Sequence, residues 1–261
     1  MGEGPEGLSR RDVVKAERGR SDLDHLRERS RREMQFDEAR AAVISDGLTA
    51  IVRDAGRFRK GMTLGGHTCG VWQRRWKANG ASFGFDVHMI AFVIRRGRRT
   101  VAAGEIQVFR PGGFVDFDDF IFCCDEESVE ANGIAELLRK HWSRSDRDRL
   151  VAWGDVVWFK RLFVESSGGR VPWPAMVESI LGNIGLEAAL MVLEAVPLVF
   201  NKTYGGYGAQ RRWSAALMRL YARDLGVQCF AGEAGKRGWM WRVWGDAPAP
   251  RSALRAKARA V

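Results

Sequence analysis

One segment near the middle of the chain constrains the fold more than any other. Seven of the ten residues of Asp155–Val164 are apolar, and most of these are β-branched or aromatic, which predicts a buried strand. A Ser/Gly loop follows at residues 166–170, and a helix begins near Pro172 or Pro174, because proline is tolerated in the first turn of a helix. A strand, a glycine-containing loop and a helix in this order predict a sheet with a helix packed on one face.

Composition excludes several classes of protein. Of the 261 residues, 46% are hydrophobic, with 10 Trp and 14 Phe, so the chain as a whole is not disordered. No apolar run reaches the roughly 18 residues of a membrane-spanning helix, and Met1–Lys15 lacks the apolar core of a secretory signal. The four cysteines are too few and too irregularly spaced for a disulfide framework, so we expect a cytoplasmic protein.

The segments before the central strand predict a mostly antiparallel arrangement. Residues 87–95 and 101–109 flank a short turn and form a hairpin, and residues 114–123 alternate enough to form a third strand. We expect residues 57–81, which hold many Gly and basic residues, to form an irregular connection. Residues 126–143 begin with acidic side chains and carry one apolar face, which predicts a helical insertion ahead of the central strand.

The segments after the central helix complete the sheet. Residues 188–196 predict another strand, and apolar positions from Trp213 to Tyr221 mark a further helix. Residues 227–231 and 239–244 predict a final hairpin. The whole pattern predicts an α+β fold, with a mixed, mostly antiparallel twisted sheet flanked by helices.

One domain with two charged extensions is expected. Residues 1–35 interleave basic and acidic side chains and form a charged N-terminal arm. The domain spans residues 36–245, and its first part, residues 36–56, carries apolar positions at helical spacing, which predicts a helical N-terminal extension. Residues 246–261 are rich in Ala, Pro and Arg and predict a basic disordered tail.

Five consecutive parts of the chain carry a resemblance to a known family. They are a strand at 156–164, a loop and helix at 166–186, a strand at 189–195, a helix at 217–226 that ends in Leu-Gly, and a closing strand at 239–242. In this order the parts resemble the GNAT acyltransferase superfamily, so a GNAT-like fold is expected. The hairpin strand at 101–106 is also similar to an earlier strand of the family, so the resemblance covers residues 83–244, about two thirds of the chain. It rests on the ordered set, not on a single motif.

The resemblance implies an acyl-CoA-dependent N-acyltransferase that uses acetyl-CoA or another acyl-CoA as co-substrate. The family's central strand aligns the pantetheine arm, a role that falls here to the backbone of Leu162, Phe163 and Val164. The loop after that strand cradles the pyrophosphate with backbone N–H groups at a helix N-terminus. Its counterparts here are Gly168, Gly169 and Arg170.

Two residues are candidates for proton transfer. By its place in the late helix, Tyr221 resembles the family's general acid, which protonates the departing CoA thiolate. Several carboxylates on or near strands are candidates for the general base, and we select Glu105 ahead of Asp118, Asp119 and Asp155. The alternative interpretations are a core aromatic residue for Tyr221 and a solvated strand residue for Glu105.

Three departures from the family pattern support a second hypothesis. Pro172 and Pro174 stand where the family's loop has glycines, and proline has no N–H to offer a phosphate. Trp158 stands where some members place a glutamate that acts as general base. Tyr221 lies one residue further from the Leu-Gly than usual in the family. The alternative is therefore a catalytically degenerate GNAT scaffold that binds nucleic acid or a protein.

The histidines and cysteines do not predict a metal site. His67 and Cys69 form a His-x-Cys pair, and the next cysteines along the chain are the adjacent Cys123 and Cys124. This spacing matches no zinc-binding pattern, so no metal is expected.

Basic charge is concentrated in two parts of the chain. The formal net charge is +10, with +6 in residues 61–110, +8 in residues 211–261 and −5 in residues 111–165. Such charge attracts nucleic acid. The alternative interpretation is a solvated basic surface that only keeps the protein soluble. The expected partners are an acyl-CoA, an amine on a small molecule, an RNA or a protein, and nucleic acid. The basic side chains that one surface would combine are Arg74, Arg75, Lys77, Arg95, Arg96, Arg98, Arg99, Arg211 and Arg212.

Overall fold

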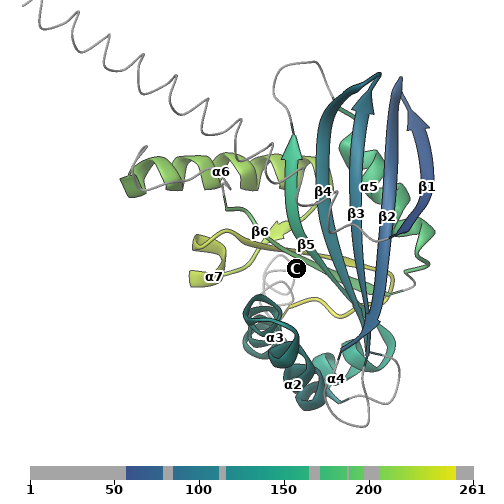
Figure 1. Ribbon diagram of the computed structural model, residues 1–261. Helices are drawn as coiled ribbons and strands as arrows, with labels where there is room; N and C mark the ends of the chain where they lie inside the picture. The colour runs from purple at the N-terminus through teal and green to yellow at the C-terminus, as the bar shows by residue number, and fades with distance from the viewer. Residues whose placement is uncertain are drawn as a thin grey trace, which may run out of the picture.

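The computed structural model of the protein shows one eight-stranded sheet with helices on both faces (Figure 1). It describes residues 57–78, 85–111, 116–164, 171–186, 188–196 and 206–250. The strand order is β1-β2-β3-β4-β5-β6-β8-β7, and within these residues the β5–β6 pair alone is parallel. The predicted α+β class with a mixed, mostly antiparallel sheet is confirmed.

The first four strands form an antiparallel meander. They are β1 (Arg57–Leu64), β2 (His67–Lys77), β3 (Asp86–Arg96) and β4 (Arg99–Arg110). The predicted hairpin of residues 87–95 and 101–109 is confirmed as β3 and β4. The prediction of an irregular connection at 57–81 is wrong for the described residues 57–78, because Gly65 and Gly66 supply the positive φ angles of a tight turn between β1 and β2.

Three helices separate β4 from β5. They are α2 (Phe117–Glu127), α3 (Val129–His141) and α4 (Arg144–Trp153). The predicted strand at 114–123 is wrong for the described residues 116–123, since Asp116 accepts a hydrogen bond from the Asp119 backbone at 2.8 Å and caps a helix there. The helical insertion is therefore longer than the predicted 126–143, and Ser128 and Ser143 cap its second and third helices.

The second half of the chain follows the predicted order of elements. The elements are β5 (Asp155–Val164), α5 (Trp173–Asn183), β6 (Ala189–Glu194), α6 (Gly206–Leu225), β7 (Gln228–Cys229), α7 (Glu233–Lys236) and β8 (Trp239–Trp244). β5, α5 and β6 form the crossover that a parallel pair requires. The predicted final hairpin is confirmed as β7 and β8.

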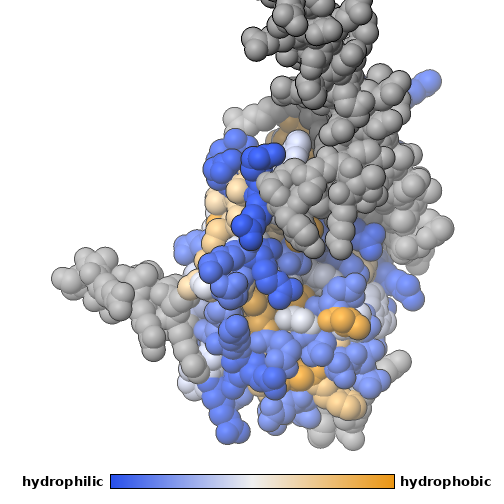
Figure 2. Space-filling view, turned by 90° about the vertical axis from the view of Figure 1, so that its left-hand side faces the viewer, coloured by the Kyte–Doolittle hydropathy of each residue, from blue (hydrophilic) through white to orange (hydrophobic). Residues whose placement is uncertain are grey.

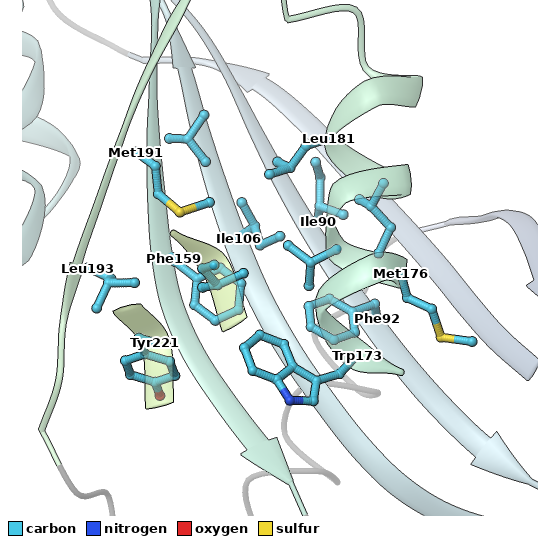
Figure 3. Packing of buried hydrophobic residues seen from close by; sticks show 14 of the residues in the cluster. Ile90, Phe92, Ile106, Phe159, Trp173, Met176, Leu181, Met191, Leu193 and Tyr221 are labelled. Carbon is cyan, nitrogen blue, oxygen red and sulfur yellow. The ribbon is translucent and has the colours of Figure 1, made fainter. Parts of the chain in front are cut away.

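Two apolar cores lie on opposite faces of the sheet, because side chains alternate along each strand. On the first face, Val157 and its neighbours pack against α5 and against Tyr221 and Leu225 of α6 (Figure 3). We call this the α5 face. On the second face, Val156 and its neighbours pack against α2, α3 and α4, and we call this the α2 face. An aromatic group of Phe85, Phe109, Phe117 and Phe120 anchors α2 there.

Part of the predicted tail is packed against the domain. The Trp142 indole N–H donates a hydrogen bond to the Pro248 carbonyl at 2.7 Å, and Trp142 is fully buried. Ala247 and Ala249 pack against the core of the α2 face. The predicted start of disorder at residue 246 is therefore corrected for residues 246–250. The predicted arm at 1–35, the helical extension at 36–56 and the remainder of the tail lie outside the described residues.

The side of the molecule shown in Figure 2 is mainly hydrophilic where its residues are described. On the side shown in Figure 2, hydrophobic residues appear in small separate groups among hydrophilic ones. Large apolar side chains of the helical insertion are exposed, namely Phe122, Val129 and Trp153. Among the described helices, none has the length and apolar character to cross a membrane.

Candidate functional site

The two parallel strands at the centre of the sheet diverge after five residue pairs. β5 and β6 are paired from Asp155↔Ala189 to Phe159↔Leu193. β5 then continues to Val164 beside β4, whereas the chain after β6 follows the opposite neighbour, with the Ala195 N–H donating to the Gly238 carbonyl at 2.8 Å. In Figure 1 the strands leave the lower end of the sheet together and then separate. We call the space between them the splay.

A β-bulge marks the point where the strands separate. On β4 the adjacent residues Ile106 and Glu105 are paired with Phe159 and Arg161, so Lys160 is the extra residue on β5. A bulge bends its strand, increases the local twist and is common beside functional sites. It also shifts the alternation of side chains by one residue. Before the bulge the odd-numbered Phe159 packs on the α5 face, and after it the even-numbered Leu162 and Val164 do.

The bulge fixes which backbone groups of β5 face the splay. A methyl group at Gly104 would lie 2.8 Å from the Arg161 carbonyl oxygen, so that carbonyl is directed toward β4. Backbone groups alternate in direction along a strand, and the groups of Leu162 and Val164 are therefore directed toward the splay. Of the three predicted pantetheine contacts, Leu162 and Val164 are suitably placed, while the backbone of Phe163 is directed toward β4.

Tyr221 lies beside the splay on the α5 face. Its ring, from α6, meets the Trp173 ring edge-on with 6.4 Å between centroids, and it lies near Phe159 and Leu193 in Figure 3. The side chain is 8% exposed, and burial raises the pKa of its hydroxyl to about 12. Tyr221 is therefore protonated at physiological pH and available as a hydrogen-bond donor.

The start of α5 has fewer backbone donors than an ordinary helix. Pro172 is the N-cap and Pro174 lies in the first turn, so neither has an N–H. Trp173 and Ala175 retain the N–H groups that a helix start leaves unpaired. The predicted pyrophosphate contacts Gly168, Gly169 and Arg170 lie outside the described residues.

Glu105 lies on the opposite face from Tyr221. Its neighbours Gly104 and Ile106 belong to the α5 face, so the Glu105 side chain is directed to the other side. Its Oε2 atom lies 3.0 Å from Arg161 Nε, with side-chain exposures of 8% for Glu105 and 39% for Arg161. The two predicted catalytic residues are thus not in contact, and β5 with its splay lies between them.

Two basic residues at the bulge, Lys160 and Arg161, were not among the predicted site residues. Arg161 pairs with Glu105, and the Lys160 amine lies 4.9 Å from the centre of the Trp158 ring. The signal was available as a Lys-Arg pair inside an otherwise apolar strand. Trp158 itself is buried on the α2 face, on the same side of the sheet as the Glu105 side chain.

The remaining carboxylates lie away from the splay. Asp118 and Asp119 begin α2, and Asp155 lies at the lower end of β5, 3.2 Å from Arg110 Nε. Desolvation raises the pKa of Asp155 to about 6, although Arg110 opposes the shift. Within the described ranges, no group of three or more His, Cys, Asp or Glu side chains has the arrangement of a metal site.

Comparisons with known proteins assign neither a family nor a function to this arrangement of residues. No family model, curated protein or solved structure matches the chain.

Proposed function

We propose that the protein is an acyl-CoA-dependent N-acyltransferase with a GNAT-like fold, and that its acyl donor binds in the splay. The observation that carries the proposal is the divergence of β5 and β6 after Phe159↔Leu193, with the backbone groups of Leu162 and Val164 directed away from β4. Backbone groups on a rigid strand that no described strand pairs suit an amide-containing arm such as pantetheine. The order of strands and helices agrees with the family resemblance.

The proposed reaction places different groups on the two faces of the sheet. An amine attacks the thioester carbon, an N–C bond forms, and the C–S bond breaks to release the CoA thiolate. Tyr221, protonated because its pKa is about 12, donates to the sulfur on the α5 face. The amine loses its proton on the other face, where Glu105 accepts it through a bridging water and Arg161 positions the carboxylate. Most of the acceleration comes from positioning the two reactants.

A second function, a catalytically inactive scaffold, is favoured by two observations. Trp173 is only 4% exposed and stacks edge-on against Tyr221, so two aromatic rings already fill the α5 face beside the diverging strands. Pro172 and Pro174 also remove two phosphate donors from the start of α5. Both features weaken donor binding, and we therefore expect an affinity lower than an ordinary acyl-CoA enzyme would have.

Calorimetric titration with acetyl-CoA tests the proposal on the full chain. We expect a dissociation constant between about 1 µM and 1 mM. Leu162→Pro removes one N–H that faces the splay without removing a bond to β4, whereas Leu162→Ala shortens the side chain and keeps that N–H. Binding should fall at least tenfold in L162P and stay near wild type in L162A.

The melting temperature of each variant shows whether it is folded. If L162P does not fold, the wild-type protein is titrated with S-acetyl-pantetheine instead. This compound carries the pantetheine arm without the nucleotide, and it should displace acetyl-CoA. A wild-type protein that shows no heat of binding at millimolar acetyl-CoA would leave the inactive scaffold as the function. Equal binding by L162P and L162A would place the donor elsewhere.

A further inference from the structure

The bulge in β5 directs two consecutive basic side chains to one face of the sheet. Phe159 and Leu162 both pack on the α5 face, so the two residues between them do not alternate. The Lys160 amine lies over the Trp158 ring on the α2 face, 4.9 Å from its centre, and Arg161 forms its ion pair on the same face. Neighbouring residues of a regular strand face opposite sides, so the extra residue brings both cations to this edge of the splay.

The strand across the splay contributes a carboxylate to the same face. Glu194 is the last residue of β6, and its neighbours Leu193 and Ala195 belong to the core of the α5 face, so the Glu194 side chain is directed to the α2 face. Phe159 and Leu193 are the last paired residues of the two strands. Lys160 and Glu194 are therefore the first residues beyond the pairing, where β5 and β6 diverge (Figure 1).

These two side chains carry opposite charges that the described part of the chain does not pair. Both are half-buried, and desolvation raises the pKa of Glu194, although Arg237 opposes the shift. The described partner of the Lys160 amine is an aromatic ring. Among the described residues neither forms an ion pair, whereas the adjacent Arg161 and Glu105 neutralise each other. A half-buried charge without a counter-charge is costly, and a ligand that supplies the opposite charge removes part of that cost.

The basic residues that the sequence analysis grouped on one surface are divided between the two faces of the sheet. Arg74 and Arg75 are adjacent on β2, so their side chains are directed to opposite faces. Arg75 forms an ion pair at the lower end of the sheet, and Arg74 lies over the Trp76 ring, 5.5 Å from its centre. The basic pair at the bulge, beside the splay, is therefore the more specific candidate for ligand recognition.

We propose that the acceptor is a zwitterion, an amine with an anionic group a few bonds away, and that Lys160 and Glu194 recognise its two charges. The proposal rests on the acyl transfer proposed above and names the class of its acceptor. Lys160 holds the anionic group, Glu194 holds the ammonium, and Glu105 remains the proton acceptor. A lysine binds carboxylate and phosphate by the same chemistry, so amino acids and aminoalkyl phosphates both fit. An amine without an anionic group leaves the Lys160 charge unmatched and binds less tightly.

Ligand-observed saturation-transfer NMR measures acceptor binding to the full chain without acetyl-CoA. The probes are L-alanine, 2-aminoethyl phosphate and L-alaninamide, which lacks the anionic group. The wild type should bind one or both of the anionic probes about tenfold more tightly than L-alaninamide. Lys160→Gln should reduce that preference to about twofold or less, because the cation is lost. Glu194→Gln should weaken binding of all three probes by about tenfold, since all carry an ammonium group.

Conservative and distant variants separate charge from packing. Lys160→Arg keeps the positive charge and should keep the preference, and the melting temperature shows whether each variant is folded. Lys77→Gln removes a positive charge at the lower end of β2, three strands from β5, and Glu130→Gln removes a negative charge from α3. Both residues are exposed, and both variants should bind the probes like the wild type.

The outcomes distinguish this proposal from acyl transfer itself. Equal binding of all three probes by the wild type, or the same loss of preference in K77Q and K160Q, would overturn the zwitterion site. If acetyl-CoA still binds in that case, the acyltransferase proposal stands with another class of acceptor. A zwitterion preference in a protein that does not bind acetyl-CoA would support the site and overturn acyl transfer alone.

Discussion

Among the described residues, the two ends of the central sheet differ in how many neighbouring strands flank β5. At the lower end, the first half of β5 has a strand on each side and buried side chains on both faces. At the upper end, the second half of β5 has β4 on one side and the splay on the other, and the β3–β4 turn exposes four arginines. Both halves belong to one ten-residue strand.

The difference indicates that the lower half of β5 contributes mainly to stability and the upper half mainly to ligand binding. Full pairing and burial contribute stability, because each buried apolar side chain adds transfer free energy and packing. The second half of β5, which one described strand flanks, contributes less to stability, and binding residues often lie at such positions. If this division holds, substitutions at the lower end change unfolding free energy, and substitutions at the upper end change binding.

The largest effect is expected from a matched pair of valines. Val157 is fully buried in the lower half of β5, whereas Val164 is half-buried at the upper end, and both lie on the α5 face. Val157→Ala should lower the unfolding free energy by about 2–3 kcal/mol through lost burial and a residual cavity. Val164→Ala should cost less than about 1 kcal/mol. Urea unfolding measures both, and equal losses would contradict the comparison.

The C-terminal segment gives the next largest effect. Ending the chain at Gly245 removes Pro248, the acceptor of the buried Trp142 N–H, and should cost about 1–3 kcal/mol for an unsatisfied buried donor. Ending the chain at Pro250 keeps this hydrogen bond and serves as the control. The two melting temperatures should differ by several degrees. If the two truncations melt together, the packing of residues 246–250 adds nothing to stability.

A pH-dependent contribution follows from Asp155 at the lower end. Burial raises its pKa to about 6 in the folded state, from an ordinary value of 3.8, so the folded protein holds this proton to a higher pH than the unfolded chain does. The contribution of Asp155 to stability is therefore greatest below about pH 4 and declines as the pH rises to about 6, by about 1–2 kcal/mol.

Unfolding of Asp155→Asn across pH 4 to 7 measures this decline. The variant cannot ionise at this position, so its stability relative to wild type should rise by that amount over the range. Asp148→Asn, on the exposed flank of α4, controls for the loss of one negative charge. A constant difference between D155N and wild type would show that burial does not shift this carboxyl.

The elements that could be predicted from the sequence are those with one dominant periodicity. β3, β4, β5 and β6 are long apolar runs bounded by turn residues, and α5 begins at its prolines. The helix α2 was predicted as a strand because its segment, FDDFIFCCDEE, places apolar residues at spacings that suit both structures. The N-cap at Asp116 decides between the two structures.

The candidate site was predictable only in part. The apolar face of the late helix placed Tyr221 in the core. The pairing of Glu105 with Arg161 depends on the register of β4 and β5 and on the bulge at Lys160. A bulge is one extra residue in a strand and leaves no composition signal here, so which side chains share a face could not be read from the sequence.

The smallest change in stability, and the most informative one for the site, is expected from Tyr221→Phe. The phenylalanine ring keeps the edge-on contact with Trp173, so only the hydroxyl is lost and the unfolding free energy should change by about 1 kcal/mol or less. Acetyl-CoA should bind with nearly wild-type affinity, because in the proposed complex the backbone of β5 holds the donor. The rate of acetyl transfer to an amine, measured by the release of the CoA thiol, should fall by about 10²- to 10⁴-fold. Trp173→Phe is the control, since it keeps the Tyr221 hydroxyl while changing the ring beside it. A Y221F protein that turns over like the wild type would show that Tyr221 is a core residue, and that the upper end binds a donor without using this hydroxyl.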